Sequence, residues 1–166
     1  MKRVLLAVSV VALAVGYAYT RPVAGQAAGL KEVVRVPKCP SHAPTFTPGG
    51  GTSRHFVRPR ASAVRLCRYY KVDWTDSEAL WRHRLVTGGK VVSNLTHSFN
   101  RLKEPPRGIF CIKDNGSEMV LWFGYAGAKP ERVVVKLSGC RFASNGKAVR
   151  STTAHLHKRL LALSRG

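Results

Sequence analysis

Three apolar runs separated by turn signals form the clearest hydrophobic pattern of the chain, between residues 109 and 149. The first two runs flank Asn115-Gly116, a dipeptide suited to a tight hairpin turn because both of its residues tolerate positive φ. The third run, Val133–Leu137, follows a second turn signal at Ala126–Pro130. The pattern predicts a three-stranded antiparallel meander as the centre of the fold.

The preceding part of the chain predicts an edge strand and a helix. Ala63–Val72 mixes apolar residues with arginine on both sides, which favours a strand at the edge of the sheet, where charge blocks unwanted pairing. Thr75–Glu78 matches a helix-capping box, and Trp81 and Leu85 lie four residues apart after it. We therefore expect a helix here that ends at Gly88-Gly89.

Two more amphipathic stripes predict two further helices. One stripe consists of Val91, Leu95, Phe99 and Leu102, and the other of Leu156, Leu160 and Leu163 after a cap at Ser151 or Thr152. The order of elements predicts an α+β fold. In this fold a small antiparallel sheet, made of the three-stranded meander plus an edge strand, has helices packed on one face.

The N-terminus has the pattern of a secretory signal. Lys2 and Arg3 precede the apolar run Val4–Val15, and Gly16-Tyr17-Ala18 offers a cleavage site, with a second candidate near Ala27. The uncharged run, Val4–Thr20, is shorter than the ~20 residues of a membrane-spanning helix, so we favour a cleaved signal over a membrane anchor. We expect the protein to be secreted or to lie on the extracellular face of the cell envelope.

The chain divides into three segments. Residues 1–18 form the predicted signal peptide, residues 19–60 form an extended segment rich in proline and glycine, and residues 61–166 form a single α+β domain. Membrane contact is expected only if the N-terminal segment stays uncleaved.

Four cysteines in an exported chain indicate two disulfides. Of the three possible connectivities, we favour Cys39–Cys67 with Cys111–Cys140, because each pair is adjacent in sequence. The second bridge would tie both ends of the meander, so we expect its loss to destabilise the protein more than loss of the first.

Several short motifs are spread over the stretch from Val64 to Leu163: Cys67-Arg68-Tyr69, Phe110-Cys111, Asp114-Asn115-Gly116, Tyr125-Ala126-Gly127, Ser138-Gly139-Cys140 and Asn145-Gly146. In its spacing this set resembles a group of secreted proteins of unknown function from high-GC Gram-positive bacteria. The resemblance implies an exported, disulfide-bonded domain and brings no catalytic residues with it.

Motifs for metal binding or catalysis are missing from the sequence. It contains neither H-E-x-x-H nor G-x-S-x-G, and its histidines are interpreted as solvated surface residues: His42, His55, His83, His97, His155 and His157. We predict no cofactor, no metal and no enzyme activity. The best enzymatic alternative is a small nuclease that uses Glu118, His155 and Arg132.

The charge is strongly positive, with 28 Lys and Arg against 8 Asp and Glu, a formal net charge of +20. Removal of the signal together with Arg21, as cleavage near Ala27 would give, takes away Lys2, Arg3 and Arg21 and leaves 25 basic against 8 acidic residues, a net charge of +17. One cluster has no acid within it and has aromatic residues interleaved: Arg54, Arg58, Arg60, Arg65, Arg68 and Lys71. Such a cluster suits phosphate backbones, although a merely solvated basic surface is an equal alternative.

We therefore predict a secreted, non-enzymatic protein that binds at or outside the cell envelope. The expected partner is an anionic envelope polymer or a nucleic acid. The alternative is a small inhibitor or partner-binding protein whose loop Thr45–Phe56 inserts into a protein target.

Overall fold

A computed structural model describes residues 34–47, 49, 54–71, 78–111 and 114–165, apart from the side chains of Lys71 and Glu78. These residues belong to one compact unit, Lys31–Gly166. The predicted signal peptide and both of its candidate cleavage sites lie outside the described residues. Within the described part of the chain, no helix is long and apolar enough to cross a membrane.

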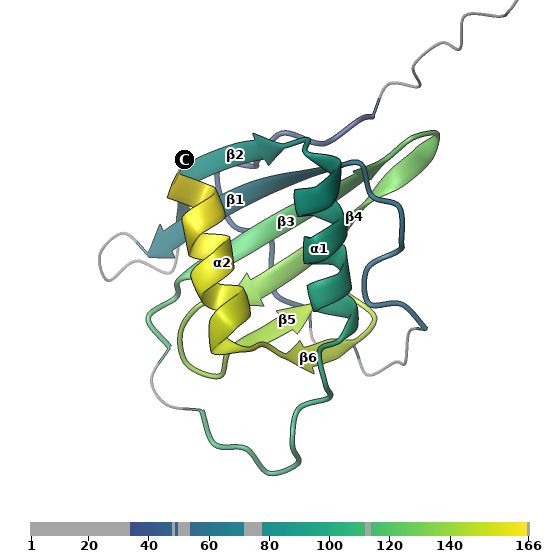
Figure 1. The fold of residues 1–166 in the computed structure, drawn as a ribbon. Coiled ribbons are helices and arrows are strands. Elements are labelled where there is room, and N and C mark those ends of the chain that lie inside the picture. The colour runs from purple at the N-terminus through teal and green to yellow at the C-terminus, as the bar shows by residue number, and fades with distance from the viewer. Residues whose placement is uncertain (1–33, 48, 50–53, 72–77, 112–113, 166) are drawn as a thin grey trace, which may run out of the picture. The chain divides into compact units, whose positions relative to one another are not determined.

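The described residues form six strands and two helices (Figure 1). In chain order these are β1 (Ala63–Lys71), β2 (Glu78–Val86), α1 (Gly89–Asn100), β3 (Glu118–Tyr125), β4 (Ala128–Lys136), β5 (Phe142–Ser144), β6 (Val149–Ser151) and α2 (Ala154–Arg165). Every pair of neighbouring strands is antiparallel, and the order across the sheet is β2-β1-β3-β4-β5-β6. The short hairpin β5–β6 extends the sheet beyond its long strands.

The predicted fold class was wrong. A six-stranded antiparallel sheet replaces the three-stranded meander with an edge strand, and the described chain is mostly sheet with only two helices. Residues 109–111, the apolar run that was to begin the meander, form no strand. The hairpin turn at Asn115-Gly116 is also absent from the described chain. Instead, the side chains of Asp114 and Asn115 accept the backbone N–H groups two residues later, which favours local turns.

The helix predicted after Thr75 is instead strand β2. Thr75–Ser77 lie outside the described residues, and Glu78 begins the strand. The four-residue interval between Trp81 and Leu85 fits one side of a helix and one side of a strand equally well. Pairing with β1 along its whole length supplies the backbone hydrogen bonds of β2. Because β2 takes the edge, β1 lies inside the sheet between β2 and β3, not at the edge as predicted.

Several local predictions are confirmed. The β1 strand has almost its predicted bounds, and the run Val133–Leu137 lies largely in β4. The turn signal at Ala126–Pro130 begins with Ala126-Gly127, which connects β3 to β4, and Asn145-Gly146 lies in the turn that connects β5 to β6. Both amphipathic helices form, although α2 begins later than predicted. Its cap is Thr153, whose hydroxyl accepts the N–H of Leu156 at 3.1 Å.

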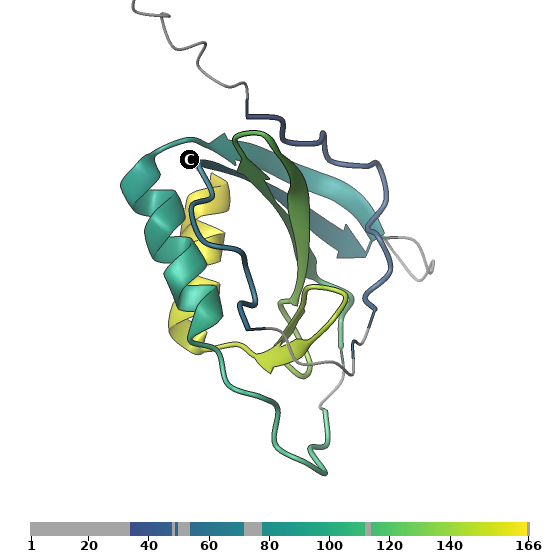
Figure 2. The same ribbon diagram turned by 90° about the vertical axis from the view of Figure 1, so that its right-hand side faces the viewer.

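Both helices pack on the same face of the sheet, which we call the helix face (Figure 2). Phe99 of α1 is fully buried there, with its ring centroid 6.2 Å from that of Phe56 and 5.8 Å from that of Phe123. The remaining members come from one side of each long inner strand and from α2: Val64, Leu66, Met119, Leu121, Val133, Val135, Leu156 and Leu160. This cluster is the main core of the protein.

The opposite face of the sheet is covered by residues 34–47, which we call the strap (Figure 2). The strap contains no helix and no named strand; among the described residues, its regular pairing is an isolated bridge between His42 and Ala79. Tyr69, fully buried beneath it, donates its hydroxyl proton to the carbonyl of Pro40 at 2.9 Å. The strap thus adapts to the sheet without regular structure of its own.

Gly124 lets the strap approach the sheet closely. A Cβ atom at this position would lie 2.5 Å from Cγ2 of Val36 and 2.8 Å from Cγ1 of Val34, too close for real contacts. A side chain larger than hydrogen would therefore push the strap away from β3.

Both favoured disulfides are confirmed. Cys39 of the strap is bonded to Cys67 of β1, with 5.7 Å between their Cα atoms. Cys111 is bonded to Cys140, with 4.8 Å between Cα atoms, but neither residue belongs to a strand. The second bridge therefore fastens a loop to a turn instead of closing the two ends of a meander.

Candidate polyanion-binding surface

An arginine-rich surface forms where β1 and β2 pair, on the side of the sheet that α2 partly covers. We define this arginine surface by Arg68 of β1, Arg82 and Arg84 of β2, and Arg165 at the end of α2, together with Trp81. The register places Arg68 opposite Arg82, and an irregularity after this pair leaves Trp81 as the extra residue on β2. The bulge thereby brings an aromatic ring next to two guanidinium groups.

Trp81 is the aromatic centre of this surface. Its side chain is 52% exposed, unusual for a tryptophan. The Cζ atoms of Arg68 and Arg82 lie 4.4 and 4.6 Å from the centroid of its ring. These cation–π contacts orient both guanidinium groups while leaving them charged.

The arginines of this surface repel each other. Partial burial lowers the pKa of Arg68, and the positive charges of Arg165 and Arg82 lower it further. Its Nε–H is buried without a hydrogen-bond partner among the described residues. Arg84 differs, because its Nη1 donates to the carbonyl of Leu163 at 3.2 Å and joins β2 to the last turn of α2.

The carboxylates with described side chains are all engaged elsewhere. Glu104 pairs with Arg150, Asp114 contacts the hydroxyl of Ser138, Glu118 pairs with Lys136, and Glu131 pairs with Arg58. Asp73, Asp76 and Glu78, which follow β1 in the sequence, have no described side chains. Among the described groups, the arginine surface therefore gathers positive charge without a carboxylate partner.

Two hollows flank Trp81. The first has a volume of about 370 Å³ and is lined by Arg68, Tyr70, Ala79, Leu80 and Trp81. The second, of about 340 Å³, is more open and is lined by Trp81, Arg82, His83, Arg84, Ser164 and Arg165. One hollow is mainly apolar and the other mainly basic, so a polymer could lie across both with anionic groups against the guanidiniums.

The fold separates the six basic residues that the sequence grouped together. Arg68 belongs to the arginine surface, whereas Arg65 lies on the strap side of β1, as strand alternation requires. Arg54, Arg58 and Arg60 belong to the segment before β1, and Arg60 adopts a positive φ of 65°. The side chain of Lys71 is not described. A run of charge in sequence does not form one face here.

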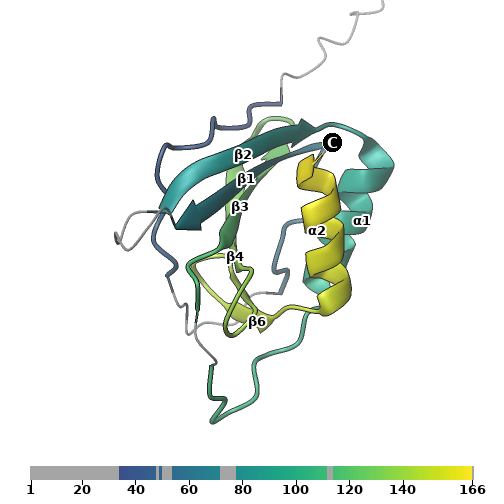
Figure 3. The ribbon, with the colours of Figure 1, turned by 90° about the vertical axis from the view of Figure 1, so that its left-hand side faces the viewer.

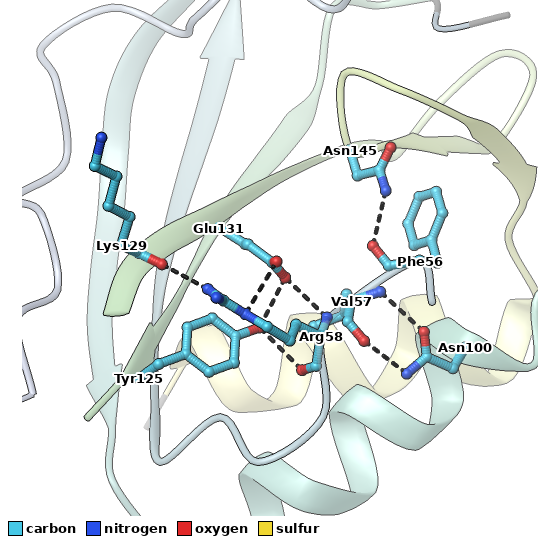
Figure 4. A network of polar contacts seen from close by, with 8 residues as sticks. All are labelled: Phe56, Val57, Arg58, Asn100, Tyr125, Lys129, Glu131 and Asn145. Atoms are coloured by element: carbon cyan, nitrogen blue, oxygen red, sulfur yellow. Dashed lines mark hydrogen bonds and ion pairs between the residues drawn. The ribbon is translucent and has the colours of Figure 1, made fainter. Parts of the chain in front are cut away.

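Arg58 in particular is committed to the structure (Figure 4). Its Nε lies 3.3 Å from Oε1 of Glu131, and its backbone N–H donates to Oε2 of the same carboxylate at 2.8 Å. Its Nη2 donates to the carbonyl of Lys129 at 2.7 Å, and its Cζ lies 4.1 Å from the centroid of the Tyr125 ring. Burial and then the neighbouring Glu131 raise the pKa of the Tyr125 hydroxyl.

The same network fastens the preceding residues to the body of the protein. The side-chain amide of Asn100 donates to the carbonyl of Val57 and accepts its N–H, at 2.8 and 2.9 Å (Figure 4). Asn145 donates to the carbonyl of Phe56, whose ring is buried in the core. Phe56, the end of the predicted insertion loop Thr45–Phe56, is therefore a core residue and not a free contact; positions 48 and 50–53 of that loop lie outside the described residues.

The residues considered for nuclease chemistry are not brought together. Glu118 is 2% exposed and forms an ion pair of 2.8 Å with Lys136 on the strap side of the sheet. Arg132 shares that side but lies two alternate positions further along the β3–β4 ladder. His155 is exposed on α2, which packs on the helix face. Within the described residues, no three His, Cys, Asp or Glu side chains gather in a way that could hold a metal ion.

His157 is not the solvated histidine that the sequence predicted. It is 6% exposed, and its Nε2 lies 2.7 Å from the hydroxyl oxygen of Thr152. That hydroxyl donates to the carbonyl of Arg141 at 2.6 Å, so its oxygen accepts a hydrogen bond from the Nε2–H group of His157. Burial first, and then the charge of Arg141, lower the pKa of His157 to about 4. A neutral His157 thus links α2 to the start of the β5 region.

Sequence reasoning missed most of the arginine surface. Trp81, Arg82 and Arg84 were assigned to a helix, and Arg165 lies about eighty residues further along the chain. The usable signal was the W-R-H-R string, which in a strand directs alternate arginines to one side.

No protein-family model, curated protein or solved structure matches this chain. The resemblance to secreted proteins of unknown function therefore stays a prediction.

Proposed function

We propose that this protein is an exported, non-enzymatic domain that binds anionic polymers at or outside the cell envelope through the arginine surface. The observation that supports the proposal is the gathering of Arg68, Arg82 and Arg165 around Trp81, with mutual repulsion that an anion would relieve. Folding keeps these charges together although they repel, which fits a site for phosphate or sulfate groups.

Export is consistent with the disulfides. Two disulfides in a chain of this size fit an oxidising compartment outside the cytoplasm. There the available polyanions include phosphate-bearing wall polymers and released nucleic acid. We expect binding to be electrostatic and independent of base sequence, because the guanidinium charges would act on phosphate groups, which carry no sequence information.

A salt titration of affinity for heparin, duplex DNA and teichoic acid tests the proposal. On duplex DNA the log of the binding constant falls with the log of salt, with a slope of about −0.9 per phosphate neutralised. Replacing Arg82 and Arg165 by glutamine should flatten this slope by up to about 2 units. Both side chains are exposed, so the variant should fold normally.

A matched variant removes the same charge elsewhere. Arg54→Gln with Arg60→Gln, taken from the group that the sequence predicted, should leave the slope close to that of the wild type. Equal flattening in both variants would show diffuse attraction by net charge, without a defined site. A wild-type protein without affinity for any of the three polymers at low salt would refute the proposed function altogether.

A further inference from the structure

A second exposed feature, remote from the arginine surface in the sequence, is the loop between α1 and β3. Residues 103–111 contain no helix or strand, and the loop extends away from the sheet and the helices (Figures 1 and 3). At the end of this loop, directly before Cys111, Phe110 is 97% exposed and Ile109 is 47% exposed. Together the two side chains form a contiguous exposed apolar patch, the kind of feature that occurs at contact sites.

Both ends of this loop are fastened to the body. At one end, the carbonyl of Lys103 accepts the N–H of Ser151 at 2.9 Å, and Glu104 pairs with Arg150 at 3.2 Å. At the other end Cys111 is bonded to Cys140. Pro105 and Pro106 restrict the backbone between these anchors. The disulfide thus restrains the backbone beside the apolar pair Ile109-Phe110, which lowers the entropic cost of inserting the pair into a partner.

Exposed basic residues lie close to the apolar pair along the chain. Lys103 and Arg107 are exposed on the loop, exposed Arg101 precedes the loop, and exposed Arg141 follows Cys140, the disulfide partner of Cys111. The carboxylate of Glu104 is paired with Arg150 and so does not offset this charge. Exposed apolar side chains with basic side chains nearby are the combination that binds an anionic bilayer. The apolar side chains enter the acyl boundary, while the basic side chains stay among the lipid phosphates.

We propose that Ile109 and Phe110 insert into the outer layer of an anionic lipid bilayer, with Arg107 and Lys103 against the headgroups. This contact is separate from polymer binding by the arginine surface and does not need an uncleaved N-terminal anchor. The two sites together would hold the exported protein at the envelope, one on lipid and the other on polymer.

Vesicle sedimentation tests the proposal with the protein lacking residues 1–27. Vesicles made of equal parts phosphatidylglycerol and phosphatidylcholine should bind the protein, and vesicles of phosphatidylcholine alone should bind it much less. Phe110→Ser should weaken binding to the anionic vesicles on the order of 10- to 100-fold. Arg107→Gln should weaken it about fivefold. Because Phe110 is exposed, its variant should fold as the wild type does.

A control variant removes a partly exposed apolar side chain from another place. Leu85 on β2 is 43% exposed, and Leu85→Ser should leave vesicle binding unchanged. The Phe110→Trp variant adds a direct measure of depth, since brominated lipids should quench its added fluorescence in anionic vesicles.

The outcomes separate this proposal from the proposed function. Phe110→Ser should keep the wild-type salt dependence of heparin and DNA binding. Conversely, adding the Arg82 and Arg165 substitutions to Phe110→Trp should leave the quenching of the introduced indole in place. Absence of vesicle binding by the wild type, or equal binding by Phe110→Ser, would overturn insertion while leaving polymer binding intact. Insertion would also be overturned if brominated lipids quenched the fluorescence of the Phe110→Trp variant no more than that of the wild type.

Discussion

The helix face and the strap face of one sheet are covered in different ways. On the helix face, α1 and α2 bury a continuous apolar cluster centred on Phe99. On the strap face, a smaller cluster around Cys67, Tyr69, Val120 and Val134 lies beneath a segment without regular structure. The same strands supply both faces, because successive side chains of a strand point to opposite sides.

The comparison shows that a segment packed on a sheet can be held by the apolar area that it buries or by specific bonds to the sheet. The helices satisfy their own backbone hydrogen bonds, so the area that they bury is sufficient to hold them. The strap has few such bonds and is held by a disulfide, by the bond from Tyr69 to Pro40 and by the close approach that Gly124 permits. We therefore expect the stability of the two faces to respond differently to the removal of a buried side chain and to the removal of a disulfide.

The largest difference should come from removing one aromatic ring on each face. Phe99→Ala removes a fully buried ring between two other aromatic residues, and we expect a loss of about 3–5 kcal/mol in the free energy of unfolding. Phe46→Ala on the strap, where the ring is only partly buried, should cost about 1–2 kcal/mol. Urea titrations followed by tryptophan fluorescence measure both. Equal losses would contradict the distinction between the faces.

The next effect concerns the disulfides. The two bridges span 28 and 29 residues, so the chain-entropy contribution of each should be nearly the same, about 3 kcal/mol. Any difference between the two double-alanine variants therefore reports on the folded state. We expect removal of Cys39–Cys67 to cost about 1 kcal/mol more, because Cys67 is fully buried under the strap.

This ranking reverses the one that the sequence suggested, in which the Cys111–Cys140 bridge closed the meander. A larger loss for the Cys111 and Cys140 variant would show that the loop of residues 103–111 stabilises the sheet more than its contacts indicate. Non-reducing peptide maps of each variant serve as the control that the remaining bridge has formed.

The smallest effect is a loss of stability at acid pH, which should arise from His157 of α2 on the helix face. The pKa of His157 is lowered to about 4 in the folded protein, against an ordinary value near 6.5. Between these pH values the unfolded chain binds a proton that the folded chain does not. The contribution of His157 to the free energy of unfolding is therefore fully present above pH 6.5 and is lost as the pH falls toward 4. From about pH 7.5 to about pH 5 the loss should be about 2 kcal/mol.

His157→Gln should remove most of this pH dependence, and His155→Gln, on the exposed side of the same helix, should not. Urea midpoints of the three proteins at the two pH values supply the measurement. If His157→Gln loses as much stability on acidification as the wild type, other groups are responsible and the helix face is not the acid-sensitive one.

The arginines before β1 and those of the arginine surface also differ because of their position in the fold. Arg58 and Arg68 are ten residues apart and equivalent by composition, yet Arg58 is paired with Glu131 and Arg68 is not paired with any described carboxylate. Glu131 lies far from Arg58 in sequence, and only the approach of β4 to the segment before β1 brings the two together. Counting charge along the chain cannot separate a structural arginine from one available to a ligand.

Features with a local cause were predictable from the sequence. The stripes that include Leu95, Phe99, Leu156 and Leu160 predicted α1 and α2 because helical hydrogen bonds join residues only four apart. The turn at Asn145-Gly146 has the same local origin, since it depends on glycine at positive φ. Adjacent pairing of the cysteines was also sufficient to give both disulfides.

Features decided by distant partners were not predictable. The four-residue spacing of Trp81 and Leu85 satisfies helix and strand alike, and the choice was made by β1, whose backbone groups pair with β2. That pairing moved β1 to the inside of the sheet and set Arg68, Arg82 and Trp81 side by side. The sequence by itself determined the elements whose hydrogen bonds are local. The tertiary structure alone decided the sheet order, the strap and the arginine surface, because the backbone partners of a strand can lie anywhere in the chain.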